Sequence, residues 1–512
     1  MNEEIAEYYE ELYRLYIDEN QPLERRYRQL RESLERVVRE RIQGNSLQTT
    51  DLAARINYVA TQYELDIKEQ NQLHTFRLTS NDILNHRKFP AKEEFLRDLR
   101  AVAFAYRKMF AQDIPLKLFS VLPKQEITSL GKKEKKEYIR RIRVCFDYAD
   151  DTYLYVHPVD IIADEPIRVV YNKPGINHEF EETIKELWRY AQLNLLDVFV
   201  DREGIYTPSF IVLEPDYLID ISSLAECYKD YGSHPANYFL SRLVPIDNAR
   251  PLLLGNIANL FLDEWIHAGE EEPDYIDCMK KAFRQYPIEL AACAELRDPS
   301  KEKEFAKDCR MHFEHIRDIV QHTFLEPGYN LDKKDAVLEP SYICEALGIQ
   351  GRLDYMQRDM SSFIEMKSGK ADEFSIQGKV EPKENNKVQM LLYMAVLEYS
   401  MGQDRRRMHP YLLYTRYPLL YPARASWAQV RRVINLRNRI VAAEYGVQFH
   451  NHSDFTRNLL AQINPEVMNE RKLRGRFWEQ YLKPSISRFR EKLSALEPLE
   501  QAYFYTLYNF IT

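Results

Sequence analysis

The N-terminal quarter of the chain carries hydrophobic residues at the spacing of amphipathic helices. A second such run lies at 92–112, and residues 52–63 follow Asp51, which can cap a helix. Because an apolar position every three or four residues is typical of a helix with one buried face, residues 1–135 are predicted to form a helical N-terminal region. A scaffold or an oligomerisation arm is the simplest role for it. The first apolar run consists of Ile5, Tyr8, Tyr9, Leu12, Leu15 and Tyr16.

After this region the hydrophobic period becomes that of short strands, and a small β-barrel of the OB type is predicted over residues 136–213. A helix at 181–192 is expected to interrupt the strands. Aromatic rings on the face of such a barrel can stack on nucleic-acid bases, although most aromatic residues in strands only pack against neighbouring side chains. The strand-like blocks are 139–148, 153–157, 167–171, 196–200 and 209–213, and the candidate rings are Phe146, Tyr148, Tyr153 and Tyr155.

Residues 214–417 are predicted to form an α/β core, and their most informative stretch runs from residue 348 to residue 393. Asp354 and Glu365 are 11 residues apart, and both lie on strand-like runs. The polar residues 357–359 between them provide a turn. The spacing therefore predicts a hairpin that brings the two carboxylates together.

Two converging carboxylates and a lysine are the components of a metal-assisted phosphodiester hydrolase. Hard oxygen ligands suit Mg²⁺ or Mn²⁺, and we expect Asp354, Glu365 and the Met366 carbonyl to hold one. Lys367 lies two residues beyond Glu365 and therefore points to the same face of the strand. It can orient the attacking water or a phosphate. The alternative is a surface hairpin whose charged side chains only face solvent.

The order Asp354, Glu365-Met366-Lys367, then Gln389 and Tyr393 on a following helix resembles the PD-(D/E)XK nuclease superfamily, specifically its RecB-type exonuclease branch. The sequence around these residues is most similar to the nuclease module of replication and repair nuclease–helicases. The resemblance implies a restriction-endonuclease-like mixed sheet flanked by helices. It also implies that Gln389 and Tyr393 steady the lysine and the scissile phosphate.

One position departs from the pattern of this family. The helix that follows residue 250 should carry a histidine as a third metal ligand, but Asn259 stands there. An asparagine carbonyl can still coordinate a hard ion, and Asp263, one turn further along, can compensate. Glu339 matches an acidic residue that precedes the glycine-rich entry to the site, either as an outer ligand or in a structural ion pair.

The six cysteines contain no CxxC pair, so reduced thiols are expected. Several RecB-type nucleases hold an iron–sulfur cluster with three cysteines downstream of the Gln-x-x-x-Tyr helix, and because no cysteine follows Cys344 here, the resemblance implies no cluster. The start of the chain is acidic and helical, and no apolar run approaches the length of a membrane span, so a cytoplasmic protein without a membrane partner is predicted.

Charge is unevenly distributed along the chain. The net charge is −8, yet residues 401–512 hold 18 Lys and Arg against 9 Asp and Glu. Residues 418–512 are therefore predicted to be a basic helical segment, which suits a polyanionic substrate as well as a solvated surface. Arg352, Lys370, Arg431 and Arg432 are candidate nucleic-acid contacts, and a second cluster consists of Arg471, Lys472, Arg474 and Arg476.

Together these features predict a metal-dependent DNA nuclease acting on single strands or ends. The last residues resemble the junction to a superfamily 1 helicase, but the chain has no G-x-x-x-x-G-K-[S/T] motif. We therefore expect a helicase motor in the same parent chain or in a partner. The alternative is a catalytically inactive DNA-binding scaffold for a partner helicase.

Overall fold

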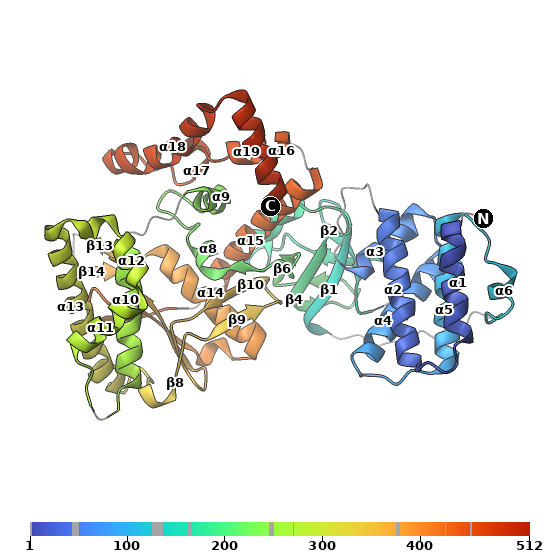
Figure 1. Ribbon diagram of the computed structural model, residues 1–512, viewed down its shortest axis with the longest axis horizontal. Helices are drawn as coiled ribbons and strands as arrows, with labels where there is room; N and C mark the ends of the chain where they lie inside the picture. The colour runs from blue at the N-terminus through green and yellow to red at the C-terminus, as the bar shows by residue number, and fades with distance from the viewer. Residues whose placement is uncertain are drawn as a thin grey trace. The chain divides into compact units, whose positions relative to one another are not determined.

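The computed structural model describes residues 3–42, 51–124, 137–161, 163, 165–244, 250–269, 271–374, 379–424, 426–450 and 453–511. Within these residues the fold is mixed α/β, as predicted, with helices and mixed sheets (Figure 1). The chain divides into two compact units. The first comprises Met1–Glu214 and Val441–Asn451 with Thr512, and the second comprises Pro215–Ile440 and His452–Ile511.

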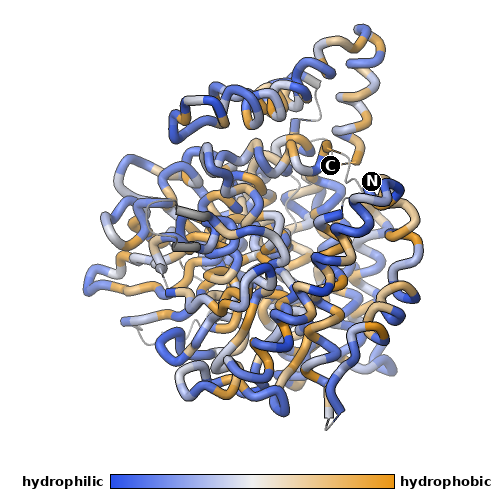
Figure 2. The backbone as a smooth tube through the Cα atoms, turned by 90° about the vertical axis from the view of Figure 1, so that its left-hand side faces the viewer, coloured by the Kyte–Doolittle hydropathy of each residue, from blue (hydrophilic) through white to orange (hydrophobic). Residues whose placement is uncertain are grey.

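The first unit begins with a helical bundle, and the helical prediction is confirmed for its described part. Its helices turn their apolar stripes inward, and the alternation of hydrophobic and hydrophilic residues can be followed along them in Figure 2. Asp51 caps α3 by accepting a hydrogen bond from the amide of Ala53 at 2.8 Å. The predicted boundary between residues 135 and 136 lies outside the described residues. The helices are α1 (Glu3–Ile17), α2 (Leu23–Ile42), α3 (Leu52–Gln62), α4 (Ile67–Leu84), α5 (Lys92–Phe110) and α6 (Leu116–Phe119).

A six-stranded sheet follows in the same unit. Strand β1 pairs antiparallel with both β2 and β4, β4 also pairs with β5 and β6, and β3 joins β2 to β5. The strands are β1 (Tyr138–Ala149), β2 (Tyr153–Pro158), β3 (Ile167–Val170), β4 (Gln192–Val200), β5 (Tyr206–Thr207) and β6 (Phe210–Leu213).

The helix predicted at 181–192 is wrong beyond its first turns. Residues His178–Phe180 form a 3₁₀ turn, and α7 (Glu181–Lys185) then ends. Tyr190 has a positive φ of 72°, which a continuing helix cannot accommodate. Its amide donates to the Phe146 carbonyl at 2.7 Å, and the Phe146 amide donates to the Ala191 carbonyl at 2.9 Å. Long-range pairing with β1 therefore overrides the local helical pattern.

The second unit is built on a five-stranded mixed sheet of order β16-β15-β12-β11-β8. β12 is parallel to β15, whereas β11 is antiparallel to both β12 and β8. Tyr355 pairs with Ile364, so the predicted hairpin is confirmed. The strands are β8 (Ala336–Leu338), β11 (Tyr355–Gln357), β12 (Ser362–Lys367), β15 (His409–Tyr414) and β16 (Leu419–Pro422).

Smaller sheets and many helices complete this unit. Strands β7 (Ile219–Asp220), β10 (Ile349–Arg352) and β9 (Ser341–Cys344) form one sheet, and β13 (Asp372–Phe374) pairs with β14 (Lys379–Glu381). Helix α15 (Trp427–His450) spans the division between the units. The remaining helices are α8 (Ile221–Ala225), α9 (Ala236–Leu243), α10 (Arg250–His267), α11 (Tyr275–Gln285), α12 (Pro287–Ala292), α13 (Pro299–Gln321), α14 (Glu384–Met401), α16 (Ser453–Ala461), α17 (Pro465–Met468), the π-helix η6 (Trp478–Leu482), α18 (Lys483–Ser494) and α19 (Pro498–Ile511), with 3₁₀ turns at Ala294–Arg297, Thr323–Leu325, Lys333–Asp335 and Arg405–Arg407.

A buried arginine ties the start of the stretch 348–393 to the rest of the second unit. Arg437 is fully buried, and its guanidinium donates to the carbonyls of Gly348, at 3.2 Å, and of Tyr217. Gly348 has a φ of +64°, and a Cβ on it would collide with that guanidinium. Only glycine fits both constraints at this position.

Two further expectations concern the described residues as a whole. All six cysteines are buried and free, as expected of reduced thiols. None of the described helices combines the length and the apolar content needed to cross a membrane.

Gly348→Ala should destabilise the protein more than Gly402→Ala does. Both glycines have positive φ, but nothing lies within 4 Å of a Cβ on Gly402. The Gly402 variant should therefore lose only about 1 kcal/mol of stability, the cost of a left-handed backbone at an alanine. Overpacking against Arg437 should cost the Gly348 variant about 1–3 kcal/mol more. Urea denaturation followed by circular dichroism measures both losses. Equal losses would show that Arg437 does not constrain Gly348.

A buried carboxyl in the helical bundle should make stability depend on pH. Asp98 accepts a hydrogen bond from the Tyr27 hydroxyl at 3.0 Å, and burial raises the pKa of Asp98 from 3.8 to about 7. The folded state thus binds this proton more tightly than the unfolded state, so stability falls as the pH rises from about 4 to about 7. Asp98→Asn should remove about 3 kcal/mol of this fall. Urea denaturation of both proteins at pH 4.5 and 7.5 tests this, and an identical pH dependence in the two would refute it.

Candidate functional site

The hairpin of β11 and β12 brings the two predicted carboxylates together. Asp354 immediately precedes β11, and Glu365 lies in β12, whose backbone runs beside it. One carboxylate oxygen of Asp354, Oδ2, accepts a hydrogen bond from the Met366 amide at 2.6 Å. The side chain of Asp354 therefore reaches across to β12 between Glu365 and Lys367.

Lys367, Glu365 and Gln389 form a closed polar triangle. Lys367 Nζ donates to Glu365 Oε1 at 2.9 Å and to Gln389 Oε1 at 2.8 Å. Gln389 Nε2 donates to the same Glu365 oxygen at 2.5 Å. Gln389 lies on α14, so this helix is fastened to the end of β12 through side chains that are largely buried.

Tyr393, one turn after Gln389, has a different role from that of a phosphate contact. Its ring is buried, and its hydroxyl donates to the Arg352 carbonyl at 2.5 Å. A Cβ on Gly351 would lie 3.1 Å from this hydroxyl, so the glycine allows the close approach. Tyr393 thus holds the backbone two residues before Asp354 and positions that carboxylate.

Glu365 retains an oxygen that no described residue satisfies. Its side chain is almost completely buried, and Oε2 has no hydrogen-bond partner. Burial, reinforced by the charge of Asp354, raises the pKa of Glu365 to about 8. Burial acts to lower the pKa of Lys367, but the adjacent Glu365 outweighs it and raises that pKa above its usual range. Burial also raises the pKa of Asp354.

Helix α10 runs beside this group. A Cβ on Gly255 would lie 3.3 Å from Ser368 Oγ, directly after β12. Two turns along, the pKa of Asp263 is raised to about 6 by burial and by the charges of Glu339 and Asp354. Asn259 stands one turn from each of these residues and is half-buried. Residues four apart share a helix face, so Asn259 faces the same side as its two neighbours.

Negative charge exceeds positive charge around the hairpin. Arg352 pairs with Glu339 at 3.2 Å, which leaves Lys367 to balance Asp354, Glu365 and Asp263. Such a deficit favours a bound cation, because buried carboxylates are costly unless a positive charge compensates them.

The donor set suits a hard divalent ion in part. The unsatisfied Glu365 Oε2 and the neighbouring Asp354 provide carboxylate oxygens, the ligands that Mg²⁺ and Mn²⁺ prefer. Over the described ranges, no three His, Cys, Asp or Glu side chains converge as a complete set of ligands. The residues therefore fit an ion that keeps several water or phosphate ligands.

The candidate nucleic-acid contacts separate into two groups. Arg352, Lys370 and Arg432 are exposed. Arg431, in contrast, is buried with only 8% of its surface exposed, so its predicted role as a surface contact is wrong. Consecutive positions of a helix point about 100° apart, so Arg431 is covered while Arg432 is exposed, a difference that charge counting cannot detect.

Sequence reasoning did not identify Glu226 and Asn385 as neighbours of the site. Asn385 Nδ2 donates to Glu226 Oε1 at 3.0 Å, and Lys229 Nζ donates to Glu226 Oε2 at 2.9 Å. Burial raises the pKa of Glu226, but Lys229, Asn385 and Lys367 together lower it below its usual value. Glu226 lies 141 residues before Lys367 along the chain. Only its i, i+3 spacing to Lys229 is visible in the sequence.

The candidate stacking rings of the first unit are also distinguished. Phe146 is buried and does not present a face to solvent. Tyr148 is half exposed and stacks on Tyr155, with ring centroids 4.2 Å apart and planes 12° apart. The Tyr155 hydroxyl donates to Asp150, so an acidic side chain lies beside these rings.

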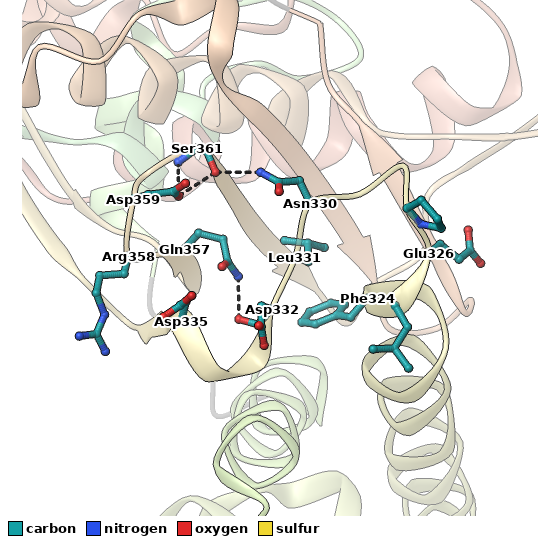
Figure 3. A pocket seen from close by; sticks show the side chains of 12 residues that line it. Phe324, Glu326, Asn330, Leu331, Asp332, Asp335, Gln357, Arg358, Asp359 and Ser361 are labelled. Atoms are coloured by element: carbon teal, nitrogen blue, oxygen red, sulfur yellow. Dashed lines mark hydrogen bonds between the residues drawn. The ribbon is translucent and has the colours of Figure 1, made fainter.

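A separate cavity of about 600 Å³ lies at the other end of the hairpin (Figure 3). Its lining includes Gln357, Asp359 and Ser361, at the turn between β11 and β12. Gln357 donates to the Asp332 carbonyl at 2.9 Å. None of the predicted catalytic residues lines this cavity, so it is distinct from the carboxylate site.

No protein-family model matches the chain, and no curated protein matches it either.

Substituting Glu365 and substituting Lys367 should have different effects on stability when metal is chelated. Glu365→Gln removes a buried carboxyl group whose Oε2 is unsatisfied, and it should leave the melting temperature unchanged or raise it. Lys367→Met should cost about 1–3 kcal/mol, because it leaves the carboxylates without their cation. Thermal denaturation in EDTA at pH 7.5 measures both effects. A loss of stability in the glutamine variant as large as that in the methionine variant would contradict the argued charge deficit.

Proposed function

We propose that the second unit is a divalent-metal-dependent nuclease of the PD-(D/E)XK type, similar to the RecB branch, that hydrolyses phosphodiester bonds of DNA. The observation that supports this most directly is the convergence of Asp354, Glu365, Lys367 and Gln389 with an unsatisfied, buried Glu365 oxygen. Solvated surface hairpins, the alternative, do not bury a carboxylate in this way.

In this proposal Asp354, Glu365 and the Met366 carbonyl hold Mg²⁺ or Mn²⁺, with Asn259 as a further candidate ligand. The ion, when bound, polarises the phosphate and lowers the pKa of a coordinated water. Asp354 is held for this role by the Met366 amide, and Tyr393 fixes the backbone just before it.

Lys367 is the proposed positioning group for the attacking water or for a phosphate oxygen. An ammonium has three N–H donors. Two are taken by Glu365 Oε1 and Gln389 Oε1, which fix the direction of the third. Its raised pKa keeps this amine protonated, so in the resting site it acts as a donor and as a positive charge.

The architecture supports the same proposal. A five-stranded mixed sheet with the acids on one hairpin is what a restriction-endonuclease-like core requires. In the first unit, the pairings β1–β2, β2–β3, β3–β5, β5–β4 and β4–β1 return to the starting strand. That circuit supports the OB-like barrel proposed for residues 136–213.

Single-stranded DNA or DNA ends are the proposed substrates, and a helicase motor, in the same parent chain or as a partner, would supply them. The excess of Lys and Arg in residues 401–512 supports a polyanionic ligand. One observation favours a second candidate, a catalytically inactive DNA-binding scaffold. This observation is the neutral amide of Asn259 at the position where the nuclease family has histidine.

Cleavage of 5′-labelled single-stranded DNA in Mg²⁺ or Mn²⁺ should be lost in Lys367→Ala. The expected decrease is at least a hundredfold, because a positioned donor contributes about 10²–10³-fold in comparable sites. Lys280→Ala is the control, since it removes an exposed lysine of the same unit that pairs with Asp277 on its own helix, and it should retain most activity. Denaturing gels measure the products, and EDTA should abolish them. Salt-sensitive DNA binding without cleavage under either metal would favour the scaffold instead.

A further inference from the structure

Residues 469–492 of the second unit, here called the aromatic–basic segment, form a basic and aromatic surface. The segment holds 8 Lys and Arg against 3 Asp and Glu. It follows α17 and includes η6 and most of α18. Sequence reasoning singled out four of its basic residues but could not assign them a ligand, because basic helices are often only solvated.

Two aromatic rings of this segment face solvent. Phe477 is 57% exposed and Tyr481 is 63% exposed, and their ring centroids are 5.8 Å apart. Trp478, between them in sequence, is buried and packs edge-on against Tyr231 at 5.8 Å. The tryptophan therefore anchors the segment, while its two aromatic neighbours offer uncovered ring faces.

The backbone that presents these rings is unusual. Lys472 and Gly475 have φ values of +53° and +100°, and residues Trp478–Leu482 form a π-helix. A positive φ at a lysine costs about 1 kcal/mol. π-Helical turns are rare overall, and those that occur often lie at functional sites. The geometry brings Phe477 and Tyr481 next to one another on the outside of the turn.

The start of the aromatic–basic segment is bound to α14, the helix that carries the candidate catalytic residue Gln389. Arg471 forms an ion pair with Glu384, the first residue of α14, and its amide donates to the Tyr231 carbonyl at 3.0 Å. The next residue of α14, Asn385, contacts Glu226, whose pKa is lowered in part by Lys367. Contacts within the second unit thus join the aromatic–basic segment to α14 and Glu226, and the charge of Lys367 acts on Glu226.

We propose that this segment binds single-stranded nucleic acid, with bases stacked on Phe477 and Tyr481 and phosphates contacted by Arg474 and Arg476. Stacking requires unpaired bases, and positive charge requires a polyanion; a single strand satisfies both conditions. A duplex hides its base faces, and an apolar protein helix would not use the arginines. The proposal deepens the proposed nuclease function by assigning the strand a path outside the catalytic site.

The neighbouring helix α19 provides a matched comparison. Tyr503 and Phe510 are 69% and 86% exposed, but α19 contains no Lys or Arg. Its rings are available without any charge to attract a phosphate backbone. A variant lacking these two rings therefore controls for the loss of exposed aromatic surface as such.

Binding is measured by fluorescence anisotropy of fluorescein-labelled (dT)₂₀ in EDTA, between 50 and 200 mM salt. Phe477→Ala/Tyr481→Ala should weaken binding at least tenfold, since each stacked base contributes about 5-fold to 100-fold. Tyr503→Ala/Phe510→Ala should bind as the unaltered protein does. Arg474→Gln/Arg476→Gln should reduce the slope of log affinity against log salt by about 1.4, because each contacted phosphate of a single strand contributes about 0.7.

The proposal is overturned if the Phe477/Tyr481 variant binds (dT)₂₀ normally, if both aromatic pairs weaken binding equally, or if a duplex of the same length binds as tightly as the single strand. Failure of the nuclease proposal gives a different result. In that case the unaltered protein binds (dT)₂₀ through this segment but does not cleave it when Mg²⁺ or Mn²⁺ is added. If the unaltered protein cleaves (dT)₂₀ but the Phe477/Tyr481 variant binds it normally, only the proposal for the aromatic–basic segment is refuted.

Discussion

The contact on which the site depends is the buried bond between Lys367 and Glu365, closed by Gln389. Oε1 of Glu365 accepts a hydrogen bond from Lys367 at 2.9 Å and another from Gln389 at 2.5 Å. The other oxygen, Oε2, has no partner among the described residues, and the charge of Asp354 acts on the same carboxyl group. A carboxylate held on one side and unsatisfied on the other is costly unless a cation completes it. The same bond therefore fixes the lysine and leaves Oε2 of Glu365 available to the metal ion that we propose.

The surrounding elements are arranged around that requirement. Helix α14 contributes both Gln389 and Tyr393, so one helix braces the lysine and the backbone that leads to Asp354. Helix α10 supplies Asp263 and brings Asn259 onto the same face. Asn259 offers a neutral amide on this face, whereas Asp263 adds a carboxyl group. The site thus gathers several negative groups around one amine.

Much of the framework could be predicted from local patterns. The period of hydrophobic residues indicated helices α1, α3 and α5 of the first unit, and the turn residues between Asp354 and Glu365 indicated the hairpin. The prediction of a helix to residue 192 was wrong, because pairing of Tyr190 and Ala191 with Phe146 outweighs helical propensity. Arg431 was misjudged for a related reason. Which face of α15 is covered depends on the packing around it, and composition does not encode that packing directly.

The sequence by itself determined which chemical groups are present and how far apart they lie on neighbouring strands, because strand geometry is local. It therefore determined that Asp354, Glu365 and Lys367 could meet. Only the tertiary structure decided which oxygen of Glu365 is satisfied, that Tyr393 supports a backbone carbonyl, and that Glu226, 141 residues away, comes near the lysine. Burial and the partners of a charge arise from contacts between segments distant along the chain, and no local spacing specifies them.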